Sequence, residues 1–431
     1  MASQDASIRG AQPRCDIGLD EALALVRGVV APLPAREVPI HAAEGLVTAC
    51  EVVAAVDSPS APVSLKDGFA VCSSDLASAS EGNPVRLELT GRAAAGSPYR
   101  GTVRSGTAVR VLTGALLPPG ADAVLSEEFT RPVGDTAVLC LADAGAGRNL
   151  LERGADVEQG RVAAAAGLAL SPAMLGYLAA GGCGSVRVHP RPRVGLLATG
   201  DELVPPGQPL ARGQVHASNM VTLSGWLDRF RMPSKLGAAS DSEAAIEEAA
   251  LGLLPDCDVL LTSGGAWKSE RDRTPAVLAR LGFAPLFHRI RLGPGKAVAF
   301  GMLGSRPVFC LPGGPPSNEM AFLQVVLPAL HWLAGRNAPP FPESRVTVTQ
   351  ELGGSVDWSR FFQARLERLD SGLTACPLRT GSRLLCQANA TALIRVPEGV
   401  ARIPAGGTAQ AQLIAPEAAF LAASGQLLGG C

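Results

Sequence analysis

The sequence predicts a multidomain α/β plus β protein, in which a central, mostly parallel α/β domain is combined with β-rich domains. Between residues 191 and 336, apolar runs that end in glycine alternate with helical segments, which is typical of a parallel sheet covered on both faces. Residues 47–149 contain short β-rich runs divided by Gly, Pro and Asp turns, and they predict an inserted β-rich domain. Residues 337–431 lack long helical periodicity except near 416–427, and they predict a C-terminal β-barrel-like domain.

The N-terminal part is expected to be helical or extended. Residues 17–31 have helical spacing, Asp20 can cap the start of this helix, and Pro32 blocks its continuation. Residues 155–190 return to helical material around residues 172–181. We therefore expect residues 1–46 plus 150–190 to form an N-terminal linker domain, which the β-rich domain interrupts.

The α/β region contains the most regular pattern in the chain. Strands are expected at residues 193–200, 258–265, 298–303 and 307–314, and helices at 218–230, 241–254, 274–283 and 316–335. Asp241 or Ser242 is the expected N-cap of the second helix, with acidic residues in its first turn. The proline-rich segment 336–344 ends this domain.

Composition excludes several classes of protein. The formal net charge is −1, which argues against a dedicated nucleic-acid binder. The ten cysteines form no CxxC pair and no cluster at zinc-ligand spacing, so free thiols in a reducing cytoplasm are expected. No apolar signal core or membrane span is visible, and a soluble cytoplasmic protein is expected. Because only 4% of residues are aromatic, we expect cores of Ala, Val and Leu.

Three glycine-bearing strand ends predict where a ligand binds. They are residues 198–207, 262–272 and 309–319, and in an open parallel sheet ligands bind beyond the carboxyl ends of the strands. Glycine permits close approach of the backbone, and a helix that follows such a turn offers unpaired N–H groups to an anion. Lys296 could add a positive charge.

Acidic residues follow two of these strand ends. Asp201 and Glu202 follow the first, and Glu270 and Asp272 follow the second. A carboxylate beside a phosphate is favourable only if a divalent cation lies between them, and Mg²⁺ is the usual choice. Plainer readings stay open: a tight turn at each glycine, a capping role for Glu202, and a solvated Lys296. No established phosphate-loop motif is present.

The β-rich segment has two further loops of interest. Asp67 and Gly68 lie in a turn between apolar runs, which is also a common hairpin signal. Thr113 and Gly114 follow a strand at the start of a turn-rich stretch, 113–124. Taken alone, neither loop indicates more than a turn.

Together and in this order, these segments resemble the molybdopterin molybdenumtransferases, the MoeA-type proteins to which the gephyrin E domain is related. The matching segments are 64–70, 113–124, Gly154 with Asp156, 199–203, 213–219, 264–272, 294–301, 311–317 and Gly381 with Ser382. The resemblance covers residues 17–415. It implies molybdenum cofactor biosynthesis: insertion of molybdate into adenylylated molybdopterin, with Mg²⁺-dependent release of AMP.

The resemblance also implies an architecture and a site. The family has four domains per subunit and forms an elongated homodimer, with each site between the α/β domain of one subunit and the β-rich domain of the other. Residues 1–46 plus 150–190 would then include dimer contacts, and 191–336 would bind molybdopterin. An enzyme that adenylylates molybdopterin and an acceptor molybdoenzyme are further possible partners; neither nucleic acid nor membrane is expected.

The site residues implied by the resemblance fall into three sets. The catalytic set is Asp67, Thr113, Asp156, Glu202, Asp241 and Asp272. The cofactor-binding set is Gly264, Gly265, Ser269, Lys296, Pro312, Gly313, Pro315, Ser317 and Ser382. The metal ligands are Asp67, Glu202 and Asp272.

The chain departs from the family pattern at ligand-facing loops, with Trp267, Ser269, Gly314, Gly293, Lys66 and Ala217 at altered positions. Gly293 removes a positive charge, which Lys66 or Lys268 could restore. These changes leave alternatives open. The alternatives are a cofactor-binding or carrier protein with weak or no turnover, a tungstate-preferring enzyme, and a scaffold.

Overall fold

The computed structural model describes residues 12–264, 273–369, 372–379 and 381–415. Contacts among these residues divide the chain into two compact units. Unit 1 contains the residues up to Ala35 and those from His189 onward, and unit 2 is Arg36–Val188. None of the described helices combines the length and apolar character needed to cross a membrane. No disulfide joins the described cysteines.

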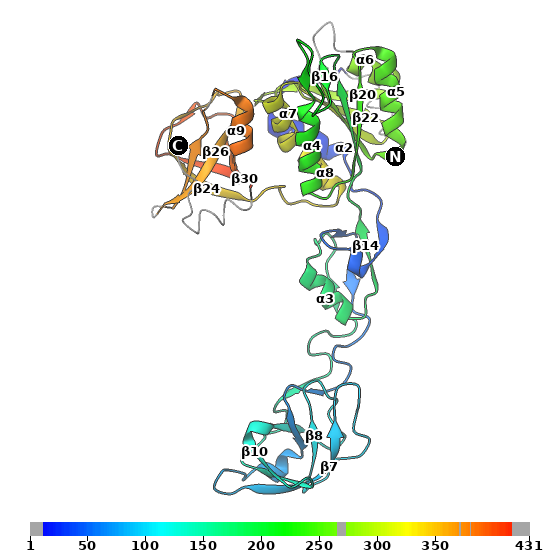
Figure 1. Ribbon diagram of the computed structural model, residues 1–431, viewed down its shortest axis with the longest axis vertical. Helices are drawn as coiled ribbons and strands as arrows, with labels where there is room; N and C mark the ends of the chain where they lie inside the picture. Colours follow the sequence, from blue (N-terminus) through cyan, green and yellow to red (C-terminus); the bar gives the residue numbers. More distant parts are fainter. Residues whose placement is uncertain (1–11, 265–272, 370–371, 380, 416–431) are drawn as a thin grey trace. The chain divides into compact units, whose positions relative to one another are not determined.

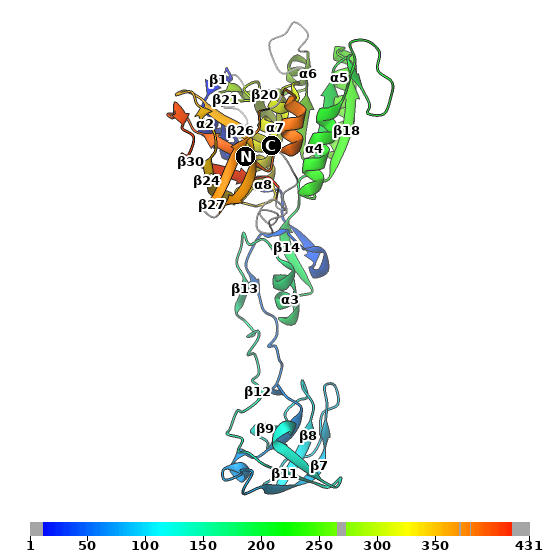
Figure 2. The same cartoon turned by 60° about the vertical axis from the view of Figure 1, so that its left-hand side comes forward.

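Unit 1 is built on a seven-stranded, mostly parallel sheet. The strand order is β1 (Arg14–Ile17), β20 (Phe283–Ile290), β22 (Ala299–Leu303), β23 (Arg306–Leu311), β19 (Val259–Ser263), β15 (Val194–Thr199) and β18 (Ser234–Ala239). Neighbouring strands are parallel except for β22, which is antiparallel to both β20 and β23. Figure 2 shows β18 at one edge of the sheet, beside the helices α4 and α5.

Helices cover both faces of this sheet (Figure 1). One face packs against α2 (Leu19–Val29), α4 (Ser218–Arg229) and a long helical segment made of α7 (Pro315–Ala321), a π-helical turn (Phe322–Val326) and α8 (Leu327–Leu333). The other face packs against α5 (Glu243–Leu253) and α6 (Thr274–Arg280). The predicted doubly covered, mostly parallel sheet is confirmed.

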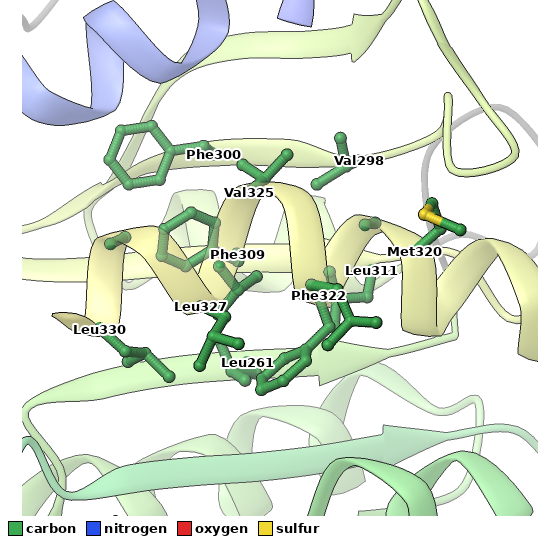
Figure 3. Packing of buried hydrophobic residues seen from close by; sticks show 14 of the residues in the cluster. Leu261, Val298, Phe300, Phe309, Leu311, Met320, Phe322, Val325, Leu327 and Leu330 are labelled. Carbon is green, nitrogen blue, oxygen red and sulfur yellow. The ribbon is translucent and has the colours of Figure 1, made fainter. Parts of the chain in front are cut away.

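The main core lies between the sheet and the long helical segment (Figure 3). Phe300 and Phe309 lie on neighbouring strands with ring centroids 4.6 Å apart, and Phe287 packs 5.6 Å from Phe300. All three side chains are fully buried, and so is Phe322 of the π-helical turn. The expectation of cores built from Ala, Val and Leu is incomplete for this core, because several of the twelve phenylalanines gather at this one interface.

The N-terminal segment differs from the expected domain boundary. The predicted helix is present as α2, but β1 pairs in parallel with β20, with Cys15 opposite His288. Leu19 and Val26 of α2 are buried in the core of the α/β domain. The segment Arg14–Val29 thus belongs to the α/β domain, because burial of this apolar face decides where the helix packs.

The rest of unit 1 is a closed β-barrel. Its strands are β26 (Ser359–Leu369), β27 (Gly372–Pro377), β24 (Glu343–Val348), β30 (Thr408–Leu413) and β28 (Ala392–Val396), and β28 pairs back with β26. The ring of pairings leaves no open edge within these five strands. The short strand β21 (Leu292–Gly293) joins β26 from outside, and β25 (Leu352–Gly353) pairs with β29 (Arg402–Ile403). A short helix, α9 (Arg383–Asn389), precedes β28.

Unit 2 contains the β-rich domain. Its six-stranded sheet has the order β10 (Thr130–Val133), β11 (Ala137–Cys140), β7 (Val85–Ala93), β8 (Thr107–Val111), β6 (Gly68–Val71) and β9 (Ala123–Ser126). Its cores consist of Ala, Val, Leu and single Phe and Cys side chains, as expected from the composition.

The remaining elements of unit 2 are short. They are β2 (Arg36–Pro39), β3 (Val47–Thr48), β4 (Val52–Val53), β5 (Val63–Ser64), β12 (Leu150–Leu151), β13 (Val162–Ala164), α3 (Pro172–Ala180) and β14 (Ser185–His189), whose last residue belongs to unit 1. The strand β14 pairs with β2, and β4 pairs with β13, so the two chain segments that flank the β-rich domain meet in small sheets.

Candidate functional site

The three glycine-bearing strand ends come together at one edge of the sheet. The strands β15, β19 and β23 are adjacent and parallel, with Ala198 opposite Ser263 and Ser263 opposite Leu311. Their carboxyl ends therefore face the same side, which is where an open α/β sheet binds ligands. The predicted convergence of these loops is confirmed.

A pocket of about 370 Å³ lies at this edge. Glu202, Gly264, Gly313 and Pro315 line it, and all four are among the residues predicted for the site. The other lining residues are Ala198, Thr199, Leu203, Val215, His216, Ala217, Ser218, Asn219, Met220, Ser263 and Leu384. The pocket is thus formed by the loops after β15 and β19, the loop before α7, the start of α4, and one side chain of α9.

Two asparagines fix the loops around this pocket. Asn318 is buried, and its Nδ2 donates to Ser263 Oγ at 3.0 Å and to the Pro312 carbonyl at 2.8 Å. Asn219 Nδ2 donates to the Gly313 carbonyl at 2.8 Å. The loop after β23 is therefore pinned to the end of β19. Sequence reasoning assigned neither asparagine to the site, although Asn318 lies within the segment 309–319 and Asn219 within the matching segment 213–219.

Glycine is required at position 264 because the backbone there lies close to the end of the neighbouring strand β15. The φ of Gly264 is +98°, and an added Cβ would lie 2.5 Å from the Thr199 carbonyl oxygen, too close for any side chain. The Thr199 hydroxyl in turn accepts a hydrogen bond from the buried Thr274 hydroxyl at 3.4 Å. Residue 264 thus lets the ends of β15 and β19 approach closely beneath the pocket.

A second, more polar pocket of about 660 Å³ shares Glu202 with the first. The carboxylates of Asp201 and Asp241 also line it. Asp201 Oδ1 accepts a hydrogen bond from the Asp241 backbone N–H at 3.0 Å, which ties the loop after β15 to the loop before α5. Ser242 is the N-cap of α5 and accepts from the Ala245 N–H at 3.2 Å, as one of the two predicted caps.

The C-terminal barrel contributes to the first pocket through α9. Leu384 lines the pocket, and Gln387 Nε2 donates to the Pro315 carbonyl at 3.3 Å and to Glu319 Oε2 at 2.8 Å. The other carboxylate oxygen of Glu319 accepts from Trp226 Nε1 at 2.8 Å. Ser382 caps α9 by accepting from Leu385 N–H at 3.2 Å; it is not among the pocket-lining residues.

In unit 2, Asp67 and Thr113 are brought together. Asp67 Oδ1 accepts hydrogen bonds from the Thr113 backbone N–H and from the Thr113 hydroxyl, both at 2.7 Å. These bonds lower the pKa of Asp67, the backbone bond more than the hydroxyl bond. Asp156 lies in a separate turn, where its N–H donates to the Ser58 carbonyl at 3.0 Å.

Comparisons with known proteins agree with this geometry. Residues 17–182 match the MoeA N-terminal region (domain I and II), and residues 195–332 match a probable molybdopterin binding domain. A molybdopterin molybdenumtransferase of Haemophilus influenzae is 33% identical, over 75% of this chain and 80% of the relative. That of Bacillus subtilis is 31% identical, over 81% of this chain and 83% of the relative.

This chain belongs to the molybdopterin molybdenumtransferase family. A solved structure of a molybdopterin biosynthesis MoeA protein from Pyrococcus horikoshii matches with a TM-score of 0.75 and 26% identity, covering 92% of this chain and 100% of that chain. The family assignment confirms the predicted place of the chain in molybdenum cofactor biosynthesis. The predicted combination of an α/β domain with β-rich and barrel-like domains is also confirmed.

Other residues predicted from the resemblance to the molybdopterin molybdenumtransferases do not line the two pockets. Lys296 is exposed, and Pro312 is buried beside Asn318. Ser317 lies in the first turn of α7 without lining either pocket. Gly265, Ser269 and Asp272 lie outside the described residues, and so does Lys268. These residues remain predictions from the family pattern.

The predicted metal ligands Asp67, Glu202 and Asp272 stay a prediction from the family pattern. Asp67 and Glu202 belong to different compact units, and Asp272 is outside the described residues. Among the described residues, no three His, Cys, Asp or Glu side chains cluster tightly enough to hold a metal ion by themselves.

Proposed function

We propose that this protein inserts molybdenum from molybdate into adenylylated molybdopterin in the cytoplasm, with Mg²⁺-dependent release of AMP. The observation that carries the proposal is the pair of pockets that share Glu202 at the ends of β15, β19 and β18. A pocket with apolar walls suits a flat pterin ring, and the adjacent polar pocket suits a phosphate held through a cation.

The residues of the polar pocket fit Mg²⁺. Asp201, Glu202 and Asp241 offer only carboxylate oxygens, the ligand type that Mg²⁺ prefers. Mg²⁺ usually keeps several waters and takes one or two carboxylates plus phosphate oxygens, so it needs no cage of three protein ligands. When bound, the cation would neutralise phosphate charge and favour departure of AMP.

The protein residues have separate tasks in this proposal. Asn219 and Asn318 hold the glycine loops in place, and Gly264 lets the ends of β15 and β19 approach closely beneath the pocket. Glu202 faces both pockets and would orient the cation toward the bond that breaks. The apolar side chains of Leu203, Met220 and Leu384 would exclude water from the ring of the substrate.

We also propose that the protein is a homodimer, and that the Asp67–Thr113 pair of one subunit contributes to the site of the other. Asp156, Asp272, Lys296, Gly265, Ser269 and Ser382 are proposed to contribute as the family pattern implies. The protein would receive its substrate from the enzyme that adenylylates molybdopterin and pass the product to a molybdoenzyme.

The experiment is a single-turnover assay of the purified full chain with adenylylated molybdopterin. AMP release is measured with and without molybdate and with and without Mg²⁺. Release that requires both additions supports the proposal. Tight binding of adenylylated molybdopterin without AMP release would contradict it and would favour a carrier protein. Tungstate in place of molybdate tests the preference between the two oxyanions.

A further inference from the structure

The polar pocket that contains Asp201, Glu202 and Asp241 also contains two arginines. Arg212 and Arg273 line it together with these three carboxylates, which gives the group a formal charge of −1. Within the described part of the chain, neither guanidinium forms an ion pair or side-chain hydrogen bond. The two arginines and the three carboxylates therefore line one cavity without forming ion pairs with one another.

The turn that carries Arg212 is held in place. Arg212 lies in the loop between β16 (Leu203–Val204) and β17 (Val215–His216). The Ala211 N–H donates to Gln214 Oε1 at 2.9 Å, and the Gln214 N–H donates back to the Ala211 carbonyl at 3.1 Å. One residue later, the Val215 N–H donates to the Glu202 carbonyl at 2.9 Å. The backbone at Arg212 is therefore fixed relative to Glu202.

The backbone at Arg273 is also held in place. Arg273 precedes α6, and its carbonyl accepts a hydrogen bond from the Val277 N–H at 3.0 Å. The next residue, Thr274, is buried and donates to the Thr199 hydroxyl. Because Thr199 stands two residues before Asp201, this contact places Arg273 next to the acidic loop.

We propose that Arg212 and Arg273 bind the phosphate oxygens of the nucleotide part of the substrate, while the carboxylates face the divalent cation. A phosphate with a bound divalent cation can pair with both kinds of side chain. Its oxygens can bind the arginines, and the cation can bind the carboxylates. Guanidinium groups suit phosphate because their planar N–H groups can bind two oxygens at once. This inference rests on the proposed function and assigns to these arginines the positive charge that Gly293 lacks.

The test measures affinity for AMP by titration calorimetry, in the presence of Mg²⁺, for the full chain. Arg212→Ala and Arg273→Ala should each weaken AMP binding about 5- to 20-fold, the loss expected for a partly exposed charge-assisted hydrogen bond. Arg212→Lys should restore part of the affinity, because the charge returns without the planar fork. Adding salt should weaken AMP binding less in the alanine variants than in the original protein.

The matched control is Arg345→Ala, which removes an exposed arginine from β24 of the barrel. Its AMP affinity should equal that of the original protein. Unchanged AMP affinity in both Arg212→Ala and Arg273→Ala would overturn the inference. So would an equal loss of adenosine binding, because adenosine has no phosphate.

Failure of the inference and failure of the proposed function give different results. If the original protein releases AMP from adenylylated molybdopterin while both alanine variants bind AMP normally, the function stands and the role of the arginines is wrong. If the original protein neither binds AMP nor releases it, both proposals are wrong. In turnover, the variants should raise KM for adenylylated molybdopterin more than they lower kcat.

Discussion

The Asp67 carboxylate of unit 2 and the Glu202 carboxylate of unit 1 differ in their hydrogen-bond partners. In unit 2, Asp57, Asp67 and Asp122 each accept hydrogen bonds from a backbone N–H, donated by Gln159, Thr113 and Ser73. The backbone N–H hydrogen bond is the largest cause of the lowered pKa of Asp57 and of Asp67, whereas the hydrogen bond from the Ser73 hydroxyl is the largest cause of the lowered pKa of Asp122. In unit 1, the Glu202 side chain lines two pockets and has no hydrogen-bond or ion-pair partner among the described residues.

The difference separates acids that hold a loop from acids that are available to a ligand. A carboxylate whose oxygens already accept backbone hydrogen bonds stabilises a turn and is oriented by it. A carboxylate without protein partners in a pocket keeps its lone pairs for a cation. Under the proposed function, Asp67 would act through its fixed orientation, and Glu202 through direct contact with the ligand.

The largest expected effect is at Glu202. Glu202→Gln should lower the rate of AMP release about 100-fold or more, because the amide removes a negative charge that faces the cation. The melting temperature should stay within about 1 °C, since the side chain holds no protein group. Single-turnover kinetics and calorimetry measure the two quantities. Glu343→Gln, on the barrel strand β24, is the control and should change neither.

Mixing two inactive variants tests whether a site combines both subunits. In a dimer of Asp67→Ala with Glu202→Ala, one of the two sites regains both carboxylates only if they come from different subunits. With random exchange, half of the dimers are mixed, so about a quarter of the original activity should return. Activity that stays at the level of the separate variants would place Asp67 and Glu202 in the same chain's site, or Asp67 outside it.

Mild acid, between about pH 6.5 and 4, should weaken unit 1 more than unit 2. Burial lowers the pKa of His331 from an ordinary value of 6.5 to about 4, with a further contribution from Arg336. The unfolded chain therefore binds a proton that folded unit 1 does not, and unit 1 loses stability as pH falls from about 6.5 to 4. Aspartates with lowered pKa values act in a lower window in both units, because their stabilisation is lost only below about pH 4; they are Asp57, Asp67 and Asp122 in unit 2 and Asp256 and Asp258 in unit 1.

The stability of each unit can be measured separately, because the two units contain different aromatic residues. All four tryptophans lie in unit 1, and both tyrosines, Tyr99 and Tyr177, lie in unit 2. Urea midpoints from tryptophan fluorescence should fall between pH 6.5 and 5, while those from tyrosine absorbance stay constant. His331→Gln should flatten the tryptophan curve. The same dependence on pH for the tryptophan and tyrosine urea midpoints would contradict the predicted difference between the two units.

The smallest expected effect is at Thr113. Thr113→Val removes the hydroxyl hydrogen bond to Asp67 and keeps the backbone one. The pKa of Asp67 should then rise partway toward its ordinary value, which carboxyl ¹³C NMR titration can follow. An unchanged pKa would mean that the backbone hydrogen bond alone sets it. Thr130→Val in the same domain is the control, because its hydroxyl bonds only to the Glu127 carbonyl.

The sequence predicted the features that local patterns determine. Apolar runs ending in glycine identified β15, β19 and β23, and capping residues identified the start of α5. The meeting of three loops at one edge followed from the rule for parallel strands. For the same reason, the segments that contain Glu202, Gly264 and Gly313 could be predicted to meet at one ligand-binding edge, and these three residues line one pocket.

Contacts between distant segments could not be predicted in this way. The strand β1 is four residues long and mostly exposed, and only its pairing with β20, far along the chain, makes it a strand. The antiparallel direction of β22 and the approach of Leu384 to the pocket likewise depend on tertiary packing. Arg212 and Arg273 have no local motif, so only the cavity reveals their relation to Glu202.

The contact of α9 with α7 has a consequence for shortened forms of this protein. A polypeptide stopping at the proline-rich linker, near residue 336, would retain every strand of the seven-stranded sheet. It would nevertheless lack Leu384, and the Glu319 carboxylate would lose the amide of Gln387. In such a fragment the pocket lined by Glu202, Gly264 and Gly313 would lack one of its walls, so the barrel completes this pocket in addition to being a separate fold.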